Sequence, residues 1–239
     1  MGKIQSIHSF STVDGPGTRV VVFFQGCPIG CIFCHNPDSW DFQGGEEIDV
    51  EHLLRRLERF RPFLKSPGLT ISGGEPLAQP EFALELTAAA KADGWHVALD
   101  TSGWGSLVEF QKVAGQADLI MFSVKHPLNP EGLSRCHREG VWQNWLSLAK
   151  LGKPVWLRYV LIPGWTDQPE ALTALKEWAG QLPNLEKVEI FPYNGLAQNK
   201  WTKLGWDSPI FHDENLMVSE TQIRAAEEIL GITRPTTER

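Results

Sequence analysis

Six short apolar runs, separated by segments with helical periodicity, constrain the fold of this 239-residue chain more than any other feature. The runs are rich in β-branched residues and lie at residues 18–25, 69–72, 96–100, 118–125, 154–161 and 186–192. They are apolar almost throughout, which is typical of strands buried on both faces of a parallel sheet. Their alternation with helices predicts an α/β domain with parallel strands inside and helices outside. About six strand–helix units fit the length, fewer than the eight that close a TIM barrel.

The segments between the runs carry apolar stripes at helical spacing. One stripe consists of Val50, Leu53, Leu54 and Leu57, and another of Trp142, Trp145, Leu146 and Ala149. Further helices are predicted over residues 80–93, 171–180 and 221–230. Residues 1–6 match a short myristoylation pattern, but a buried first strand is the better interpretation. No repeat or polar linker marks a boundary, so we expect a single domain over residues 1–239.

The composition argues against several classes of function. The net charge is −7, whereas a nucleic-acid-binding surface would be basic. No window approaches the roughly 18 consecutive apolar residues of a membrane span. The N-terminus lacks the basic-then-apolar pattern of a secretory signal. We therefore expect a cytoplasmic protein that binds neither nucleic acid nor membrane.

Every unusual polar or glycine-containing motif lies at the end of a predicted strand. A cysteine-containing loop, residues 27–34, follows the first run, and the later runs end in residues 72–76, 100–103, 123–125, 158–164 and 192–194. Chemistry in parallel α/β architectures is placed at the carboxyl ends of the strands. We therefore expect these motifs to lie close together, at the carboxyl ends of the strands.

Three of the four cysteines, Cys27, Cys31 and Cys34, are spaced Cys-x3-Cys-x2-Cys. Three thiolates on one loop suit a [4Fe–4S] cluster and leave one iron open, as catalytic metal sites do. A structural zinc that also used His35 is the main alternative, but adjacent Cys34 and His35 could hardly complete one tetrahedron. A redox disulfide would leave one thiol unexplained. The isolated Cys136 is interpreted as an incidental thiol.

The cysteine loop resembles the cluster loop of the radical S-adenosylmethionine (SAM) enzymes. A wider similarity to the activating enzymes of glycyl radical enzymes, in particular those of pyruvate formate-lyase, extends from residue 4 to about residue 205. It is carried by residues 7–10, 12–17, 23–27, 34–36, 40–41, 156–160, 163–165, 192–193 and 200–201. The resemblance implies a partial (β/α)6 barrel of the radical SAM type. Some relatives contain a ferredoxin-like insert with additional cysteines; only Cys136 remains here, so no insert is expected.

The resemblance also implies one [4Fe–4S] cluster, with the three loop cysteines acting catalytically as its ligands, and SAM chelated at the open iron. One electron from the cluster would split the sulfonium C–S bond and give a 5′-deoxyadenosyl radical. Gly73, Gly74 and Glu75 match the motif that binds the SAM amino group. Phe33 and His35 match positions beside the adenine; plain core packing and loop capping are their alternative interpretations.

Further contacts implied by the resemblance lie on the later strands. Asp100 and Ser102 match ribose and cation contacts, with helix capping as the alternative. Lys125 matches a lysine that approaches the SAM carboxylate. Arg158 lies inside an apolar strand, so its charge needs a carboxylate partner, and we assign it to the catalytic residues with an internal ion pair as the alternative.

Two positions depart from the family pattern. Ser123 stands where the family has an aspartate beside a monovalent cation, and Asn194 stands where it has a histidine. Both are kept as candidate contacts to SAM. A serine hydroxyl carries no charge, so we expect at most weak cation binding.

The function implied by the resemblance is removal of a Cα hydrogen from one glycine of a glycyl radical enzyme of the pyruvate formate-lyase type. Residues 14–17 resemble the loop that meets the glycine-bearing peptide, although a tight turn is the simpler interpretation. A flavodoxin or ferredoxin would donate the electron. Two alternatives remain open: a radical SAM enzyme that acts on another glycyl radical enzyme or a small molecule, and a non-catalytic iron–sulfur electron-transfer protein.

Overall fold

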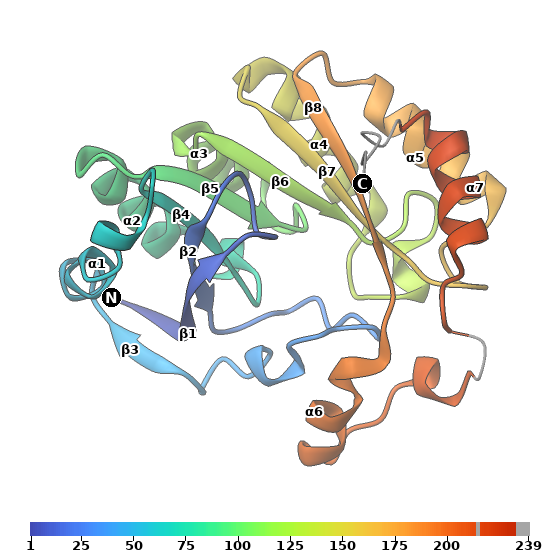
Figure 1. Ribbon diagram of the computed structural model, residues 1–239, viewed down its shortest axis with the longest axis horizontal. Helices are drawn as coiled ribbons and strands as arrows, with labels where there is room; N and C mark the ends of the chain where they lie inside the picture. Colours follow the sequence, from blue (N-terminus) through green and yellow to red (C-terminus); the bar gives the residue numbers. More distant parts are fainter. Residues whose placement is uncertain (214–215, 233–239) are drawn as a thin grey trace.

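The computed structural model describes residues 1–213 and 216–232. Within them, eight strands form one sheet in the order β3-β1-β2-β4-β5-β6-β7-β8. Six consecutive strands of this sheet are parallel: β2 (Arg19–Phe24), β4 (Gly68–Gly73), β5 (His96–Thr101), β6 (Leu119–Val124), β7 (Val155–Leu161) and β8 (Leu185–Pro192). The strands curve into an open barrel with helices outside (Figure 1), which confirms the predicted partial (β/α)6 architecture. The predicted domain also includes residues 214–215 and 233–239, which lie outside the described residues.

Two antiparallel strands extend the sheet beyond β2. The first strand expected from residues 1–6 is β1 (Gly2–Ser11), which pairs with β2; it is buried only at Gly2 and Ile4. The other, β3 (Glu46–Ile48), pairs with β1 and has no counterpart among the predicted strands. Both lie at one edge of the sheet. Only the parallel strands therefore have their carboxyl ends at the site.

The helices begin and end at recognisable signals. They are α1 (Val50–Glu58), α2 (Pro80–Ala92), α3 (Leu107–Gln116), α4 (Arg138–Leu151), α5 (Pro169–Gly180), α6 (Gln198–Lys203) and α7 (Glu220–Leu230). Asp49, Ser106 and Ser219 cap α1, α3 and α7 through their side chains. Short 3-10 helices are η1 (Pro37–Ser39), η2 (Arg61–Phe63), η3 (Pro76–Ala78), η4 (Pro130–Gly132), η5 (Gly195–Ala197) and η6 (Pro209–His212). No helix in the described part of the chain is both long and apolar enough to cross a membrane.

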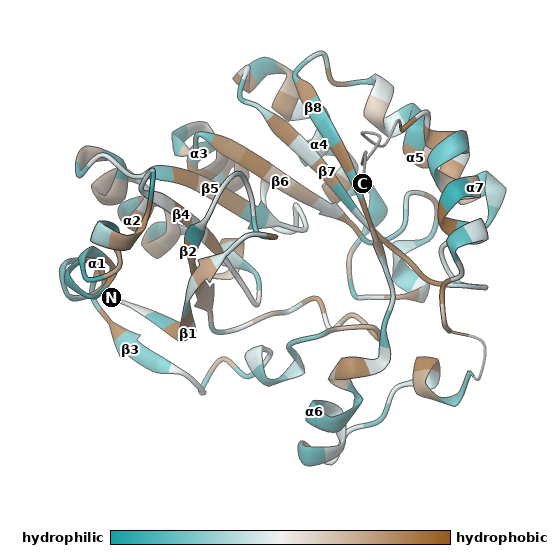
Figure 2. Ribbon diagram, in the orientation of Figure 1, coloured by the Kyte–Doolittle hydropathy of each residue, from teal (hydrophilic) through white to brown (hydrophobic). Residues whose placement is uncertain are grey.

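The core lies between the barrel strands and the inner faces of the helices. The strands are coloured apolar along most of their length in Figure 2, and Val20, Ile71 and Phe122 are fully buried. The predicted stripe on α1 is buried at all four positions. The predicted stripe on α4 is wrong at Leu146, which is exposed, because Val141 and Leu148 share the buried face with Trp145 instead.

Candidate active site

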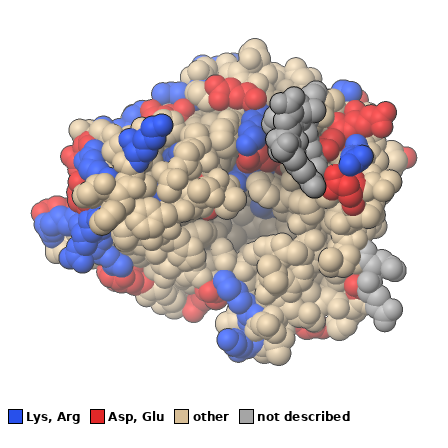
Figure 3. All heavy atoms as spheres, in the orientation of Figure 1, with Lys and Arg blue, Asp and Glu red and all other residues tan. Residues whose placement is uncertain are grey.

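The motifs at the strand ends converge, as predicted, on a cavity of about 580 Å³ at the open end of the barrel. This volume lies within the range of ligand pockets, which is about 300–1,000 Å³. Figure 3 shows a hollow near the centre of the face. All fourteen candidate residues line the cavity: Cys27, Cys31, Phe33, Cys34, His35, Gly73, Gly74, Glu75, Asp100, Ser102, Ser123, Lys125, Arg158 and Asn194.

The cysteine loop is held by chain segments that are distant in sequence. The Ile32 amide donates to the Leu133 carbonyl (2.9 Å), and the Arg135 amide donates to the Ile29 carbonyl (2.7 Å). From the segment after β8, the Ser208 hydroxyl donates to the Ile32 carbonyl at 2.6 Å. These bonds fix the backbone that carries the three thiols.

The three thiols are free and largely buried, with Ile29 and Phe33 as apolar neighbours. Burial raises the pKa of Cys27 to about 12, and it raises the pKa values of Cys31 and Cys34 as well. Buried thiols with raised pKa values become thiolates only when a cationic centre binds them and their protons leave. Three neighbouring thiols in an apolar surround therefore fit an iron–sulfur cluster, whose binding would release their protons.

The geometry does not match the zinc alternative. Among residues 1–213 and 216–232, no three His, Cys, Asp or Glu side chains are grouped closely enough to hold one metal ion. His35 Nε2 lies 3.2 Å from the carbonyl oxygen of Asn194, so this ring is oriented by the segment that follows β8. Burial lowers the pKa of His35, which favours the neutral ring. A neutral ring that lines the cavity suits stacking on a planar ligand.

The turn at the end of β4 packs directly against the residues that precede the cysteine loop. Gly73 has φ +111°, and a Cβ there would lie 2.1 Å from the amide nitrogen of Phe24. A Cβ on Gly74 would lie 2.3 Å from the carbonyl oxygen of Gly26. Only glycine fits such close backbone approaches. The Glu75 amide then donates to the Gly26 carbonyl at 3.1 Å, which joins this turn to the residue before Cys27.

The buried carboxylate of Glu75 connects the turns after β4 and β5. It accepts hydrogen bonds from the Thr101 hydroxyl (2.6 Å), the Ser102 amide (2.9 Å), the Ser102 hydroxyl (2.7 Å) and the Leu77 amide (3.1 Å). Burial raises the pKa of Glu75, and these four donors oppose that shift. Four donors saturate a carboxylate, so its oxygens hold the site together and leave little capacity for a ligand ammonium.

The alternative interpretation of Asp100 and Ser102 as helix caps is contradicted, because Ser106 caps the following helix α3. Asp100 instead accepts a hydrogen bond from the Ser72 hydroxyl at 2.8 Å. Its second oxygen lies 3.5 Å from the hydroxyl of Ser123. Asp100 and Ser123 therefore face each other at the ends of neighbouring strands.

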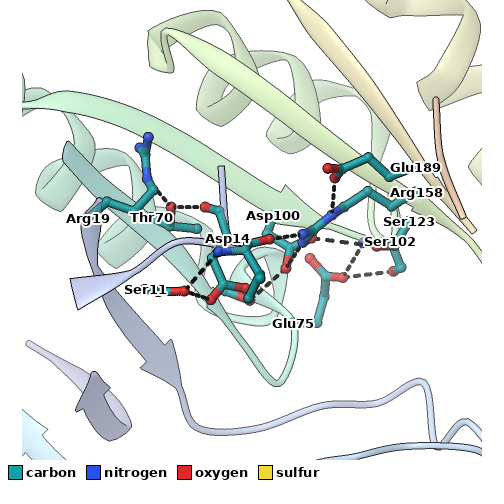
Figure 4. Close-up of polar contacts among 12 residues, drawn as sticks. Ser11, Asp14, Arg19, Thr70, Glu75, Asp100, Ser102, Ser123, Arg158 and Glu189 are labelled. Carbon is teal, nitrogen blue, oxygen red and sulfur yellow. Dashed lines mark hydrogen bonds and ion pairs between the residues drawn. The ribbon is translucent and has the colours of Figure 1, made fainter. Parts of the chain in front are cut away.

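Arg158 forms the internal ion pairs that were its alternative interpretation. Its guanidinium lies 3.3 Å from Asp100 and 3.0 Å from Glu189, and it donates to the Val13 carbonyl at 2.6 Å. Figure 4 shows Arg158 between these two carboxylates, with Asp14 beside Asp100. Arg158 thus connects the loop before β2 to strands β5 and β8.

The loop between β1 and β2, residues 12–18, lies inside the open barrel rather than forming a simple turn. The Thr70 hydroxyl donates to the Asp14 carbonyl at 2.6 Å, and buried Arg19 donates to that hydroxyl (2.6 Å) and to the Pro16 carbonyl (3.0 Å). Val13 and Asp14 consequently line the cavity. The sequence marked this loop as a motif but gave no reason to place it within the barrel.

Lys125 is the candidate residue with unused binding capacity. Its side chain is largely buried and lines the cavity, and it makes no hydrogen bond or ion pair with any described residue. Burial lowers its pKa, but the nearby Cys31, Cys136, Asp100 and Glu75 outweigh burial and raise it. A cavity-lining ammonium without a hydrogen-bond partner in the protein gains one when an anionic ligand binds. The position therefore suits an anionic group of a bound molecule.

Comparisons with known proteins agree with this site. The sequence profile of the radical SAM superfamily matches residues 21–175. The pyruvate formate-lyase-activating enzyme of Clostridium pasteurianum is 40% identical over 212 residues, which cover 87% of this chain and 88% of the relative. The chain belongs to the radical SAM superfamily and, within it, to the family of pyruvate formate-lyase-activating enzymes. The Escherichia coli K12 pyruvate formate-lyase 1-activating enzyme is 38% identical over 215 residues, with 86% of each chain covered.

Solved structures support the fold. A radical SAM methyltransferase from Sphaerobacter thermophilus matches with a TM-score of 0.65 at 20% identity, over 90% of this chain and 63% of the other. A domain of a pyruvate-formate lyase-activating enzyme from Bacteroides vulgatus matches with a TM-score of 0.55 at 23% identity, over 69% of this chain and 92% of the other. Membership of the superfamily implies a [4Fe–4S] cluster and SAM as cofactors.

Proposed function

We propose that this protein removes a Cα hydrogen from one glycine of a glycyl radical enzyme of the pyruvate formate-lyase type. One observation carries the proposal: three free thiols and an ammonium, that of Lys125, with no hydrogen bond or ion pair to a described residue line one cavity. The chain also aligns with pyruvate formate-lyase-activating enzymes over most of the length of both. A pure electron carrier would need the thiols but not the lysine.

Cys27, Cys31 and Cys34 would hold the cluster, and Lys125 would neutralise the carboxylate of SAM. When bound, the cluster and SAM supply a one-electron cleavage of the sulfonium C–S bond and a carbon radical that can remove a hydrogen atom. Backbone carbonyls of Gly73 and Gly74 are suited to the amino group, because no side chain blocks approach there.

The remaining candidates divide into contacts and positioning residues. Phe33 and His35 would flank the adenine, and Ser123 and Asn194 would offer uncharged polar groups to the ribose. Asn194 also accepts from the Leu196 amide at 3.2 Å, so part of its side chain is used to cap η5. For Glu75, Ser102 and Arg158, the observed hydrogen bonds and ion pairs support positioning roles, in which Arg158 orients Asp100.

The protein partner fits the open barrel and the loop that lies within it. Glycine lacks a Cβ, so its α-radical can lie flat with the adjoining amides and be delocalised. Val13 and Asp14 of this loop line the cavity, and Asp14 would face such a peptide. We further propose a single domain without a ferredoxin-like insert, a flavodoxin or ferredoxin as electron donor, weak use of a monovalent cation, and a cytoplasmic location.

The test is an anaerobic assay with reconstituted protein, SAM, a reduced donor and a purified glycyl radical enzyme. We expect 5′-deoxyadenosine together with an EPR signal from a glycyl radical on the partner. SAM cleavage without a radical on any glycyl radical enzyme would favour a small-molecule substrate. Absence of 5′-deoxyadenosine from protein with a full cluster would favour the electron-transfer alternative.

A further inference from the structure

Four aromatic side chains pack against one another, and one of them contacts the third cysteine of the cluster loop. This aromatic cluster consists of Trp40, Trp201, Trp206 and Phe211. Trp40 follows η1, whereas the other three come from the segment after β8, whose helix α6 contacts η1 (Figure 1). The Trp40 ring is perpendicular to Trp201 at 5.1 Å and stacked on Trp206 at 5.3 Å. These contacts fix the plane of the Trp40 indole.

Two of these indoles, those of Trp201 and Trp40, lie near Cys34. Trp201 Nε1 donates to the backbone carbonyl of Cys34 at 2.9 Å. Trp40 lines the same cavity as Cys34. Its Nε1 is buried and forms no hydrogen bond of standard geometry with any described residue. This N–H nevertheless lies close enough to the Cys34 thiol to lower its pKa, as the Asn36 amide also does. Burial raises the same pKa by more, so the net shift is upward. The Asn36 amide nitrogen is 3.3 Å from Cys34 Sγ.

An unsatisfied buried N–H is rare in a folded protein and implies an acceptor. The candidate acceptor is the sulfur of Cys34, which lines the same cavity and becomes a strong acceptor only as a thiolate. The other two cysteines of the loop lack such a donor: within the described residues, Cys27 is approached by the backbone amides of Ile29 and Gly30, and the sulfur of Cys31 is affected mainly by burial and the charge of Lys125. Trp40 is therefore placed to act on one thiolate selectively.

We propose that the Trp40 indole N–H donates a hydrogen bond to the Cys34 thiolate when the cluster is bound, and that this bond raises the reduction potential of the cluster. Reduction adds one negative charge, which is shared with the sulfur ligands. A donor that stabilises negative charge on sulfur stabilises the reduced form more than the oxidised form. Trp40 is a positioning residue in this proposal because it acts on the cluster through Cys34.

The inference rests on the cluster in the proposed function but not on the identity of the substrate. Its test is a redox titration of reconstituted protein, followed by the EPR signal of the reduced cluster, without SAM or any partner protein. In Trp40→Phe the ring remains and the donor is lost, so we expect a more negative midpoint potential and less reduced cluster at a fixed potential. The Asn36 amide still donates in this variant, so the cluster should remain bound.

Trp206→Phe is the matched control, because it removes an indole N–H from the aromatic cluster but leaves the Cys34 donors in place. We expect its midpoint potential to equal that of the wild type. An unchanged potential in Trp40→Phe would overturn the proposal, as would an equal shift in both variants. A protein with normal potentials that forms no glycyl radical would instead count against the proposed function.

A second measurement keeps the proposal testable if Trp40→Phe fails to bind iron. Wild-type protein and the Trp201→Phe and Trp206→Phe variants are labelled with indole-15N tryptophan, and the reduced cluster is measured by pulsed EPR. We expect a 15N coupling to the cluster in all three proteins, because each retains Trp40. Absence of the coupling from the wild type would overturn the proposal.

Discussion

Replacing Lys125 by methionine removes the one cavity-lining ammonium that has no hydrogen bond or ion pair with a described residue, and keeps a side chain of similar length. Truncating one partner of a buried charge pair costs about 2–5 kcal/mol. Every 1.4 kcal/mol is a factor of ten in affinity. We therefore expect Lys125→Met to weaken SAM binding by a factor between roughly 30 and a few thousand.

The assay is equilibrium binding of SAM to cluster-loaded protein, with iron and sulfide content measured in parallel. Lys112→Met is the matched control, since this lysine is exposed on α3 and should leave the affinity unchanged. Thermal unfolding of cluster-free Lys125→Met should show only a small loss of stability, because the ammonium has no hydrogen bond or ion pair to lose there, and only its longer-range attraction to Asp100 and Glu75 disappears. A change in SAM affinity below about threefold would refute the assignment, and a large loss of stability would indicate a structural role.

Three further predictions concern the rest of the site. Substitution of Cys31 by serine should abolish iron binding, whereas Cys136→Ala should leave iron content unchanged; loss of iron in the second variant would mean that the ligand set is wrong. SAM cleavage by the wild type should depend weakly on potassium, because Ser123 is uncharged and the guanidinium of Arg158 already lies 3.3 Å from Asp100. Ser123→Asp should increase that dependence, and a steep potassium requirement in the wild type would contradict this account. Arg158→Met should lower the free energy of unfolding by about 3 kcal/mol, since it leaves the half-buried Asp100 without its cation and leaves Glu189 with Lys187 alone; urea unfolding of cluster-free protein measures this, and a loss below about 1 kcal/mol would mean that the ion pairs contribute little.

The parallel strands could be predicted from the sequence because each is buried on both faces and therefore apolar throughout. The short strand β3 could not, since Glu46 and Glu47 are exposed and its strand character comes from pairing with β1. The error on α4 has a similar origin. Trp142 and Leu146 are apolar, but the orientation of the helix is decided by packing of Trp145 against neighbouring elements.

The residue types at the site could be predicted from motifs at the strand ends. Which of those side chains already have partners within the protein, and which remain able to bind a ligand, could not. Glu75 and Lys125 are both charged residues near the ends of strands, yet one is saturated by donors from the next turn and the other has none. The partners of Arg158 lie on β5, on β8 and in the loop before β2, so only the tertiary structure brings them together. The role inferred for Trp40 likewise depends on the segment after β8.

Transfer of deuterium from the partner protein to 5′-deoxyadenosine tests the proposed function most directly. The partner glycyl radical enzyme is produced with Cα-deuterated glycine and incubated with reconstituted protein, SAM and a reduced donor. The account predicts one deuterium in the 5′-deoxyadenosine formed, measured by mass spectrometry, together with a glycyl radical on the partner. Unlabelled 5′-deoxyadenosine from the same mixture, with full cluster content and active SAM cleavage, would contradict it.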